Sequence, residues 1–152
     1  MSKIAAVAGL AVLMAACGDK SAETPAVDST VAAAPAPAPA GATHDVNMIM
    51  EGTTYKFVPA ELSIKVGDQV VFHNVSGGPH NVAFFADSIP AGGKEVIDPQ
   101  RKDQIAPLSS ALLVDPNATL SVSFANAPVG DYKFTCTPHM AMGMHGKITV
   151  TQ

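Results

Sequence analysis

The stretch KFTCTPHMAMGMHGKITV, residues 133–150, holds one cysteine, two histidines and three methionines between segments that alternate like β-strands. Its cysteine, Cys136, is one of only two in the chain. An isolated cysteine near a strand end can be a buried small hydrophobe, a reactive thiol or a metal ligand. The spacing favours a metal ligand, because His139 follows three residues later and Met144 eight residues later. A thiolate, an imidazole and a thioether from one tight loop suit copper in both of its oxidation states.

Such a site needs a second imidazole from elsewhere in the fold. His80 is the strongest candidate, since it follows a Gly-Gly-Pro turn and opens a new strand at a domain end, where loops cluster. His73 falls in mid-strand at a solvated position, and His44 lies at the boundary of the N-terminal segment. His145 directly follows Met144, so in an extended chain it points the opposite way, to the surface.

The N-terminal residues predict export. Residues 1–17, MSKIAAVAGLAVLMAAC, have one lysine and then a small and apolar run of about 13 residues, which is too short to span a bilayer. The ending LMAAC resembles a bacterial lipobox, so we expect a signal peptide over 1–16 and lipidation of Cys17. The alternative is an ordinary secretory signal that leaves Cys17 as a stray thiol. If Cys17 is lipidated, Cys136 has no intramolecular disulfide partner.

Residues 17–43 contain an alanine- and proline-rich segment that we expect to be a disordered linker. Valine is its only large apolar residue, so it cannot bury enough surface to offset the entropy of ordering it. The Ala-Pro repeat favours an extended path, which would hold a domain away from a membrane. A disordered tail with no spacing role fits the same composition.

Residues 44–152 form the predicted domain, an antiparallel β-sandwich or barrel. Short β-branched and aromatic runs alternate with glycine, proline and asparagine. The candidate strands are 45–50, 61–66, 69–75, 80–86, 118–124, 130–136 and 146–151. Residues 87–117 are less regular, with one short helix expected near 107–113. The net charge of −4 indicates no nucleic-acid partner.

Two stretches resemble the blue-copper proteins: FVPAELSIKVGDQVVFHNVSGGPHNVAFFADSIPAGG (57–93) and GDYKFTCTPHMAMGMHGKITV (130–150). The resemblance is greatest to plastocyanin, with pseudoazurin and amicyanin related, and it covers nearly all of 45–152. It implies an all-β, cupredoxin-like Greek-key sandwich of about seven to eight strands. It also implies one type 1 copper ion held by His80, Cys136, His139 and, weakly along the axis, Met144. Met144 is preferred to Met142 because the family's axial methionine precedes x-Gly-Lys, as Met144 does here.

The resemblance also assigns roles around the metal. Asn81 matches a position whose side chain ties the two ligand loops together near the cysteine sulfur; the alternative is a turn residue that satisfies local backbone. An apolar docking surface is expected around the edge of His139, formed by Gly78, Pro79, Pro138, Met140 and Met142. Thr135 stands where plastocyanins commonly have a tyrosine implicated in a second electron route, which disfavours photosynthetic partners.

Together these features predict a lipid-anchored, exported, monomeric electron carrier rather than an enzyme, because four ligands leave no open copper position for a substrate. Its partners would be transient redox proteins such as a cytochrome, an oxidase or a reductase, met on the periplasmic or cell-surface side of the membrane. The alternative is a copper-binding or delivery lipoprotein that buffers exported copper. Met140, Met142 and His145 favour that alternative, because they are additional soft or nitrogen donors.

Overall fold

The computed structural model describes residues 41–98 and 103–152. The expected signal peptide, Cys17 and nearly all of the expected linker lie outside these residues. No helix within the described ranges is long and apolar enough to cross a membrane.

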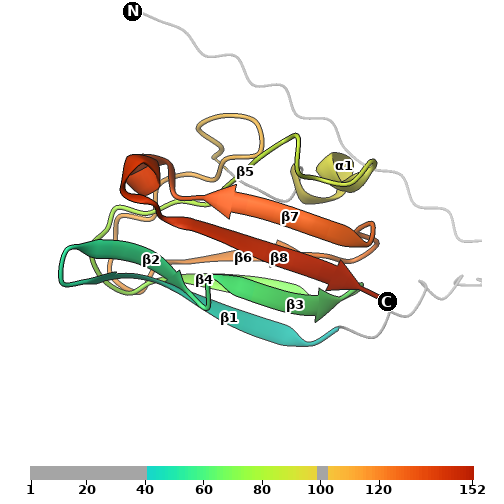
Figure 1. Ribbon diagram of the computed structural model, residues 1–152, viewed down its shortest axis with the longest axis horizontal. Helices are drawn as coiled ribbons and strands as arrows, with labels where there is room; N and C mark the ends of the chain where they lie inside the picture. Colours follow the sequence, from blue (N-terminus) through green and yellow to red (C-terminus); the bar gives the residue numbers. More distant parts are fainter. Residues whose placement is uncertain (1–40, 99–102) are drawn as a thin grey trace, which may run out of the picture. The chain divides into compact units, whose positions relative to one another are not determined.

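Two four-stranded sheets form a β-sandwich (Figure 1), which confirms the predicted sandwich and excludes the barrel. One sheet has the order β2-β1-β4-β6 and the other β3-β8-β7-β5. The strands are β1 (Thr43–Glu51), β2 (Thr54–Val58), β3 (Glu61–Lys65), β4 (Gln69–Asn74), β5 (Ala83–Phe84), β6 (Thr119–Ser123), β7 (Gly130–Thr135) and β8 (His145–Thr151).

The expectation of wholly antiparallel sheets is wrong, because each sheet contains one parallel pair. β1 pairs in parallel with β4, and β3 pairs in parallel with β8. Parallel neighbours cannot be joined by a tight hairpin, so the chain leaves one sheet and crosses to the other between them. Local alternation of residues predicts strands but not which strands become neighbours. The parallel direction of these two pairs could therefore not be predicted from the residue pattern.

Two elements of the prediction need correction. β2 was not predicted, although the Gly52-Thr53 turn and the inward positions of Tyr55 and Phe57 have the pattern of a hairpin strand. The helix expected near 107–113 is absent from that described segment, and the short helix α1 lies instead at Gly93–Ile97. Asp98, just after α1, accepts hydrogen bonds from the Leu108 N–H and the Gln104 amide, which ties these two residues to the end of α1.

Alternate residues of the strands fill the space between the sheets. In β4 every second side chain is buried, and in β7 Tyr132 and Phe134 point inward. The Phe134 ring packs edge to face against Phe57 and Phe72, with ring centroids 4.8 and 5.4 Å away. Such contacts add to the burial of these large rings and hold β7 rigidly in place. β7 therefore delivers the residue after its end, Cys136, to a fixed position.

One end of the sandwich carries the expected metal ligands. There a short 3₁₀ helix, η2 (Thr137–Met142), joins the end of β7 to the start of β8 (Figure 1). Pro138 lies in the first turn of η2, where its missing N–H leaves no helical hydrogen bond unmade. Gly143 ends η2 with a φ of 83°, a left-handed conformation that glycine adopts at little cost.

Candidate metal centre

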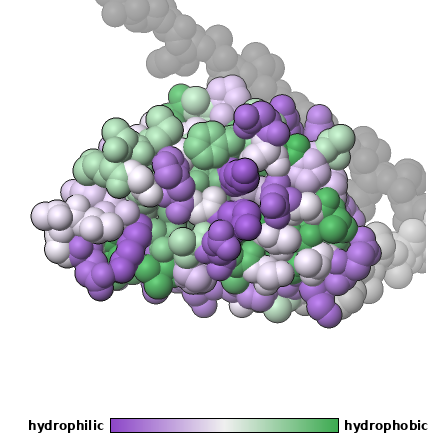
Figure 2. All heavy atoms as spheres, in the orientation of Figure 1, coloured by the Kyte–Doolittle hydropathy of each residue, from purple (hydrophilic) through white to green (hydrophobic). Residues whose placement is uncertain are grey.

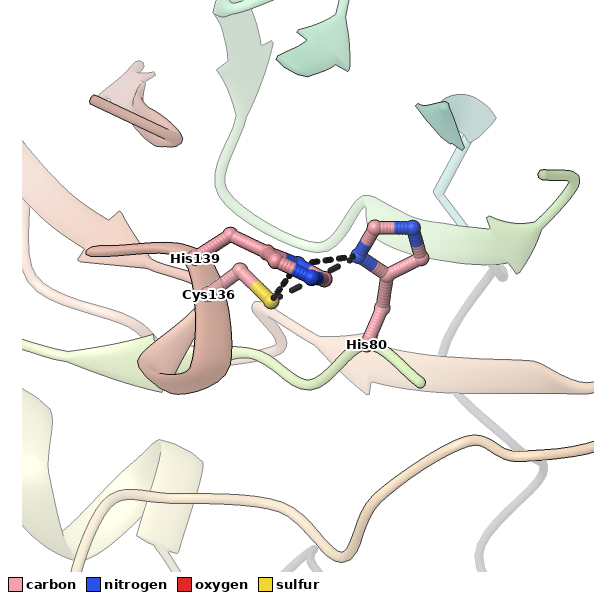
Figure 3. A group of neighbouring side chains, drawn as sticks. All are labelled: His80, Cys136 and His139. Carbon is pink, nitrogen blue, oxygen red and sulfur yellow. Dashed lines mark hydrogen bonds between the residues drawn. The ribbon is translucent and has the colours of Figure 1, made fainter. Parts of the chain in front are cut away.

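Three of the expected ligands converge at this end of the sandwich. His80 precedes β5, Cys136 follows β7, and His139 lies in η2. Figure 3 shows the three side chains turned toward one point. The structure thus brings together residues from two loops that lie far apart in the sequence.

The three donor atoms are spaced as a single metal ion requires. The Cys136 Sγ lies 3.5 Å from the His80 Nδ1 and 3.4 Å from the His139 Nδ1, and the two Nδ1 atoms are 3.2 Å apart. A point equally far from three atoms so spaced lies about 2 Å from each, the length of a metal–nitrogen bond in proteins. The donor set of one thiolate and two imidazoles is also the trigonal set that type 1 copper takes.

The orientation of His80 is set by its other ring nitrogen. Its Nε2 lies 2.9 Å from the carbonyl oxygen of Ser76, which can only accept a hydrogen bond. The proton of a neutral His80 therefore sits on Nε2, and Nδ1 presents its lone pair to the centre. Ser76 was not singled out by the sequence, because a backbone carbonyl leaves no mark in the residue pattern.

The irregular loop before β6 holds His80 in place. The N–H of His80 donates to the carbonyl of Leu113, and the N–H of Leu113 donates back to the carbonyl of His80, at 3.2 and 2.7 Å. The side-chain amide of Asn74 donates to the carbonyls of Leu113 and Asp115 and fixes the same loop from β4. These contacts explain why β5 is much shorter than the strand expected over 80–86: its first residues pair with this loop instead.

The loop from Cys136 to Met144 closes on itself. The Cys136 N–H donates to the Met144 carbonyl, and the Met144 N–H donates to the His139 carbonyl. The Thr135 hydroxyl donates a further bond to the Met144 carbonyl at 2.9 Å. Met144 is fully buried, whereas Met140 and Met142 are 45% and 52% exposed.

The buried side chain of Asn81 links the two ligand loops. Its Oδ1 accepts from the Thr137 N–H at 2.7 Å, next to Cys136. Its Nδ2 donates to the Thr137 hydroxyl at 3.2 Å and to the Ser109 hydroxyl at 3.1 Å. One side chain thereby joins the segment before β5, the loop that contains Ser109 and the start of η2.

Burial shifts the pKa values of two of the three donor groups. It raises the pKa of the Cys136 thiol, which the backbone N–H groups of Asn81 and His139 partly oppose by hydrogen bonding to the sulfur. Burial, and to a lesser degree His80, lowers the pKa of His139. The His139 imidazole is therefore ready to bind a cation, while the thiol must release its proton when a metal ion binds.

An aromatic contact at the centre was missed by the sequence-based prediction. The Tyr55 ring of β2 stacks on the His139 imidazole, with ring centroids 3.8 Å apart and planes 12° from parallel. The stack shields one face of His139 and restricts rotation of its ring. An inward-pointing Tyr55 follows from the alternation of β2, so recognising that strand would have placed the ring near the core, although not on His139.

The remaining histidines lie elsewhere. His73 contacts Asp45 through Nε2 at 2.7 Å on the outside of β4, and His44 contacts Asp68 at 2.9 Å. His145 is exposed, as predicted from its position after Met144. The residues expected to form the docking surface are all exposed: Gly78, Pro79, Pro138, Met140 and Met142.

Comparison with known proteins identifies the family. Residues 44–151 match the family described as copper binding proteins, plastocyanin/azurin family. The chain is 38% identical to plastocyanin of Ginkgo biloba over 106 residues, which are 70% of this chain and 98% of that protein. It is 42% identical to plastocyanin of Solanum crispum over 94 residues, 62% of this chain and 86% of that protein. The structure resembles a mutant plastocyanin of fern, with a TM-score of 0.56 and 27% identity over 70% of this chain and 99% of that one. The chain therefore belongs to the plastocyanin/azurin family of copper-binding proteins, and the buried triangle of His80, Cys136 and His139 fits that family.

Proposed function

We propose that this protein is a membrane-tethered, exported electron carrier that passes one electron at a time between redox partners. As a plastocyanin-like cupredoxin it is an electron carrier and not an enzyme. Bound copper supplies the one-electron chemistry, between Cu(II) and Cu(I). The observation that carries the proposal is the buried triangle of donor atoms, about 2 Å from a common point.

We assign the ligands as His80, Cys136 and His139, with Met144 as the axial ligand. The burial of Met144 supports its assignment, as do the three backbone and hydroxyl hydrogen bonds that fix its peptide groups beside Cys136 and His139. Met142, the competing residue, is half exposed on η2. Rigid, dry ligands suit electron transfer, because the site then changes little between the two oxidation states.

Electrons would enter and leave over the edge of His139. His80, Cys136 and Met144 are 0% exposed, whereas His139 is 7% exposed, so it is the ligand that comes nearest to solvent. The exposed docking residues on either side of it are small or apolar, and Met140 and Met142 are the largest of them. A modest apolar contact of this kind suits transient complexes that must dissociate quickly.

Export and anchoring rest on the N-terminal residues. The apolar run before Cys17 and the alanine- and proline-rich linker support a lipid anchor that leaves the copper domain free to reach partners near the membrane. Mass spectrometry of the membrane-extracted protein tests this: a diacylated N-terminal cysteine is expected, and an unmodified chain cut elsewhere would contradict the anchor.

Addition of Cu(II) to the purified copper-free protein tests the site itself. An intense visible band from thiolate-to-copper charge transfer is expected, and Cys136→Ser should abolish it. A pale spectrum in the wild type, typical of copper bound by nitrogen and oxygen alone, would contradict the proposal.

Copper buffering is the alternative function, and the exposure of Met140 and Met142 favours it. Exposed thioethers bind Cu(I) in an exchangeable way, unlike a buried ligand set. Stoichiometry separates the two functions. One tightly held copper with reversible redox chemistry supports the carrier, and two or more labile Cu(I) ions per chain support the buffer.

A further inference from the structure

The last residue of β7, Thr135, has a buried hydroxyl group. Strand alternation places its side chain on the outer face of the β3-β8-β7-β5 sheet, the same face as Lys133. In Figure 2, which has the orientation of Figure 1, hydrophilic residues gather over the middle of β7 and β8. Lys133 is exposed on this face, opposite Lys147 of β8, whereas Thr135 is only 3% exposed. A hydroxyl so far from water needs a hydrogen-bond partner inside the protein.

That partner is the backbone carbonyl of Met144. The Thr135 Oγ1 lies 2.9 Å from this oxygen and 3.5 Å from the Cys136 carbonyl oxygen. A hydroxyl has one proton to donate, and the shorter distance assigns this proton to the Met144 carbonyl. The same carbonyl also accepts the Cys136 N–H at 3.1 Å, so both of its lone pairs are used. The Met144 carbonyl is therefore held by two donors at once.

This carbonyl belongs to a ring of backbone hydrogen bonds among three of the assigned ligands. The His139 N–H donates to the Cys136 carbonyl at 3.1 Å, and the Met144 N–H donates to the His139 carbonyl at 3.3 Å. The Cys136 N–H closes the ring on the Met144 carbonyl. The Thr135 hydroxyl adds a side-chain bond to this ring from the end of β7, a strand that is paired on both sides. It thereby fixes the backbone from which the Met144 side chain extends.

The position of Met144 matters for the reduction potential. An axial thioether is a weak ligand, and the potential of a type 1 copper site depends on it. Because the bond is weak, the distance between the sulfur and the metal ion depends on how the surrounding hydrogen bonds hold the residue. A thioether is drawn more strongly to Cu(II) than to Cu(I), because the charge of Cu(II) is higher. A thioether that is free to move closer therefore stabilises the oxidised state and lowers the potential.

From these observations we infer that Thr135 is a positioning residue that raises the reduction potential. Its hydroxyl holds the Met144 carbonyl and so keeps the Met144 thioether from moving closer to the metal ion. The inference rests on the proposed function, because it requires a copper site in which Met144 is the axial ligand. It adds to that function a residue outside the ligand set that adjusts the potential at which electrons are exchanged.

Replacement of Thr135 by valine tests the inference, because valine has nearly the same shape and lacks the hydroxyl. Copper-loaded Thr135→Val should keep the intense visible band, and the equilibrium between Cu(I) and Cu(II) should shift about threefold toward Cu(II). For a one-electron couple, this shift lowers the reduction potential measured by voltammetry by about 30 mV. Thr135→Ser keeps a hydroxyl and should restore most of the wild-type potential. Thr135→Ala should show the same fall as Thr135→Val, so the test does not depend on how valine packs.

Thr151→Val is the matched control. The Thr151 hydroxyl also donates to a backbone carbonyl at 2.9 Å, that of Ile64, but Thr151 is at the opposite end of β8 from Met144. Thr151→Val and Thr135→Val should both lower the midpoint of thermal unfolding, because each loses one hydrogen bond. Only Thr135→Val should change the reduction potential.

Hydrogen exchange in the copper-free protein gives a measurement that does not depend on the metal. The Cys136 N–H shares its acceptor with the Thr135 hydroxyl, so loss of the hydroxyl loosens the ring at this point. Followed by NMR, the Cys136 amide should exchange about fivefold faster in Thr135→Val than in the wild type. Its exchange should be unchanged in Thr151→Val.

A double variant shows whether Thr135 acts through the Met144 side chain. In Met144→Leu there is no thioether to move, so adding Thr135→Val should change the potential by less than about a third of its effect in the wild type. A hydroxyl that acted only by stabilising the fold, or through its own dipole, would have the same effect in both backgrounds.

The inference is overturned by an unchanged potential in Thr135→Val, by a Thr135→Ser variant that restores nothing, or by an equal fall in Thr151→Val. It is also overturned by a full-sized fall in the Met144→Leu background or by unchanged exchange of the Cys136 amide in Thr135→Val. Failure of the proposed function looks different: the wild-type protein would lack the visible band, or Met144→Leu would keep the wild-type potential.

Discussion

Replacement of Asn81 by alanine is the sharpest test of how the metal centre is held together. Asn81 is fully buried, and its side chain joins three segments of the chain through Thr137 and Ser109. Its backbone N–H also reaches the Cys136 sulfur, and this hydrogen bond survives the substitution. The variant therefore removes the cross-link and leaves the ligand set intact.

The magnitude follows from the hydrogen bonds that the substitution removes. Asn81→Ala deletes three side-chain hydrogen bonds, each with a net value of about 1 kcal/mol. The buried space left by the amide adds to the loss of stability. We expect the free energy of unfolding of the copper-free protein to fall by about 3 kcal/mol.

Urea unfolding of the copper-free protein measures this value, and Ser109→Ala is the matched control. Ser109 shares only one of the three bonds, so its variant should lose about 1 kcal/mol. With copper bound, Asn81→Ala should keep the intense visible band. The reasoning fails if Asn81→Ala costs no more than Ser109→Ala, because Asn81 would then not hold the ligand loops together.

Three further predictions concern single side chains. Met144→Leu should keep the visible band and shift the reduction potential measured by voltammetry, whereas Met142→Leu should leave the band and the potential unchanged. If only Met142→Leu shifts the potential, Met142 and not Met144 is the axial ligand. Tyr55→Leu should lose the ring stack on His139 and lower the free energy of unfolding by about 1 kcal/mol, with Tyr55→Phe as the control that keeps it. The Lys65 N–H, His44 and the Ala42 N–H all bond to Asp68 and lower its pKa. Its contribution to stability is therefore present above the ordinary Asp pKa of 3.8 and is lost as the pH falls from there through the lowered value. Asp68→Asn should flatten this acid limb, measured by urea unfolding from neutral pH to well below pH 3.8, and an unchanged limb would exclude Asp68 as its source.

Most of the ligands of the metal centre could be predicted from the spacing of residues in the sequence. Cys136 and His139 lie in one short loop, so any compact folding of that loop brings their donor atoms close. His80 was chosen from its turn and strand start, and the structure places its Nδ1 in the same triangle. Met144 as the axial ligand stays a prediction, supported by its burial.

The contacts that hold the ligands in place could not be predicted in this way. The Ser76 carbonyl, the pairing of His80 with Leu113 and the Tyr55 stack join residues that are distant in sequence or act through their backbone. Backbone groups are the same in every residue, and a residue pattern cannot show which of them will meet. The loop before β6 had no assigned role for this reason.

The sequence by itself determined most of the strand-forming segments, the inward face of β7 and the donor types of the centre, because these depend on residue chemistry and on spacing along the chain. The tertiary structure alone decided the parallel pairing of β1 with β4 and of β3 with β8, the tautomer of His80 and the opposition of Lys133 and Lys147. Each of these depends on which distant segments become neighbours. That choice is made by packing the whole core, and no local pattern contains it.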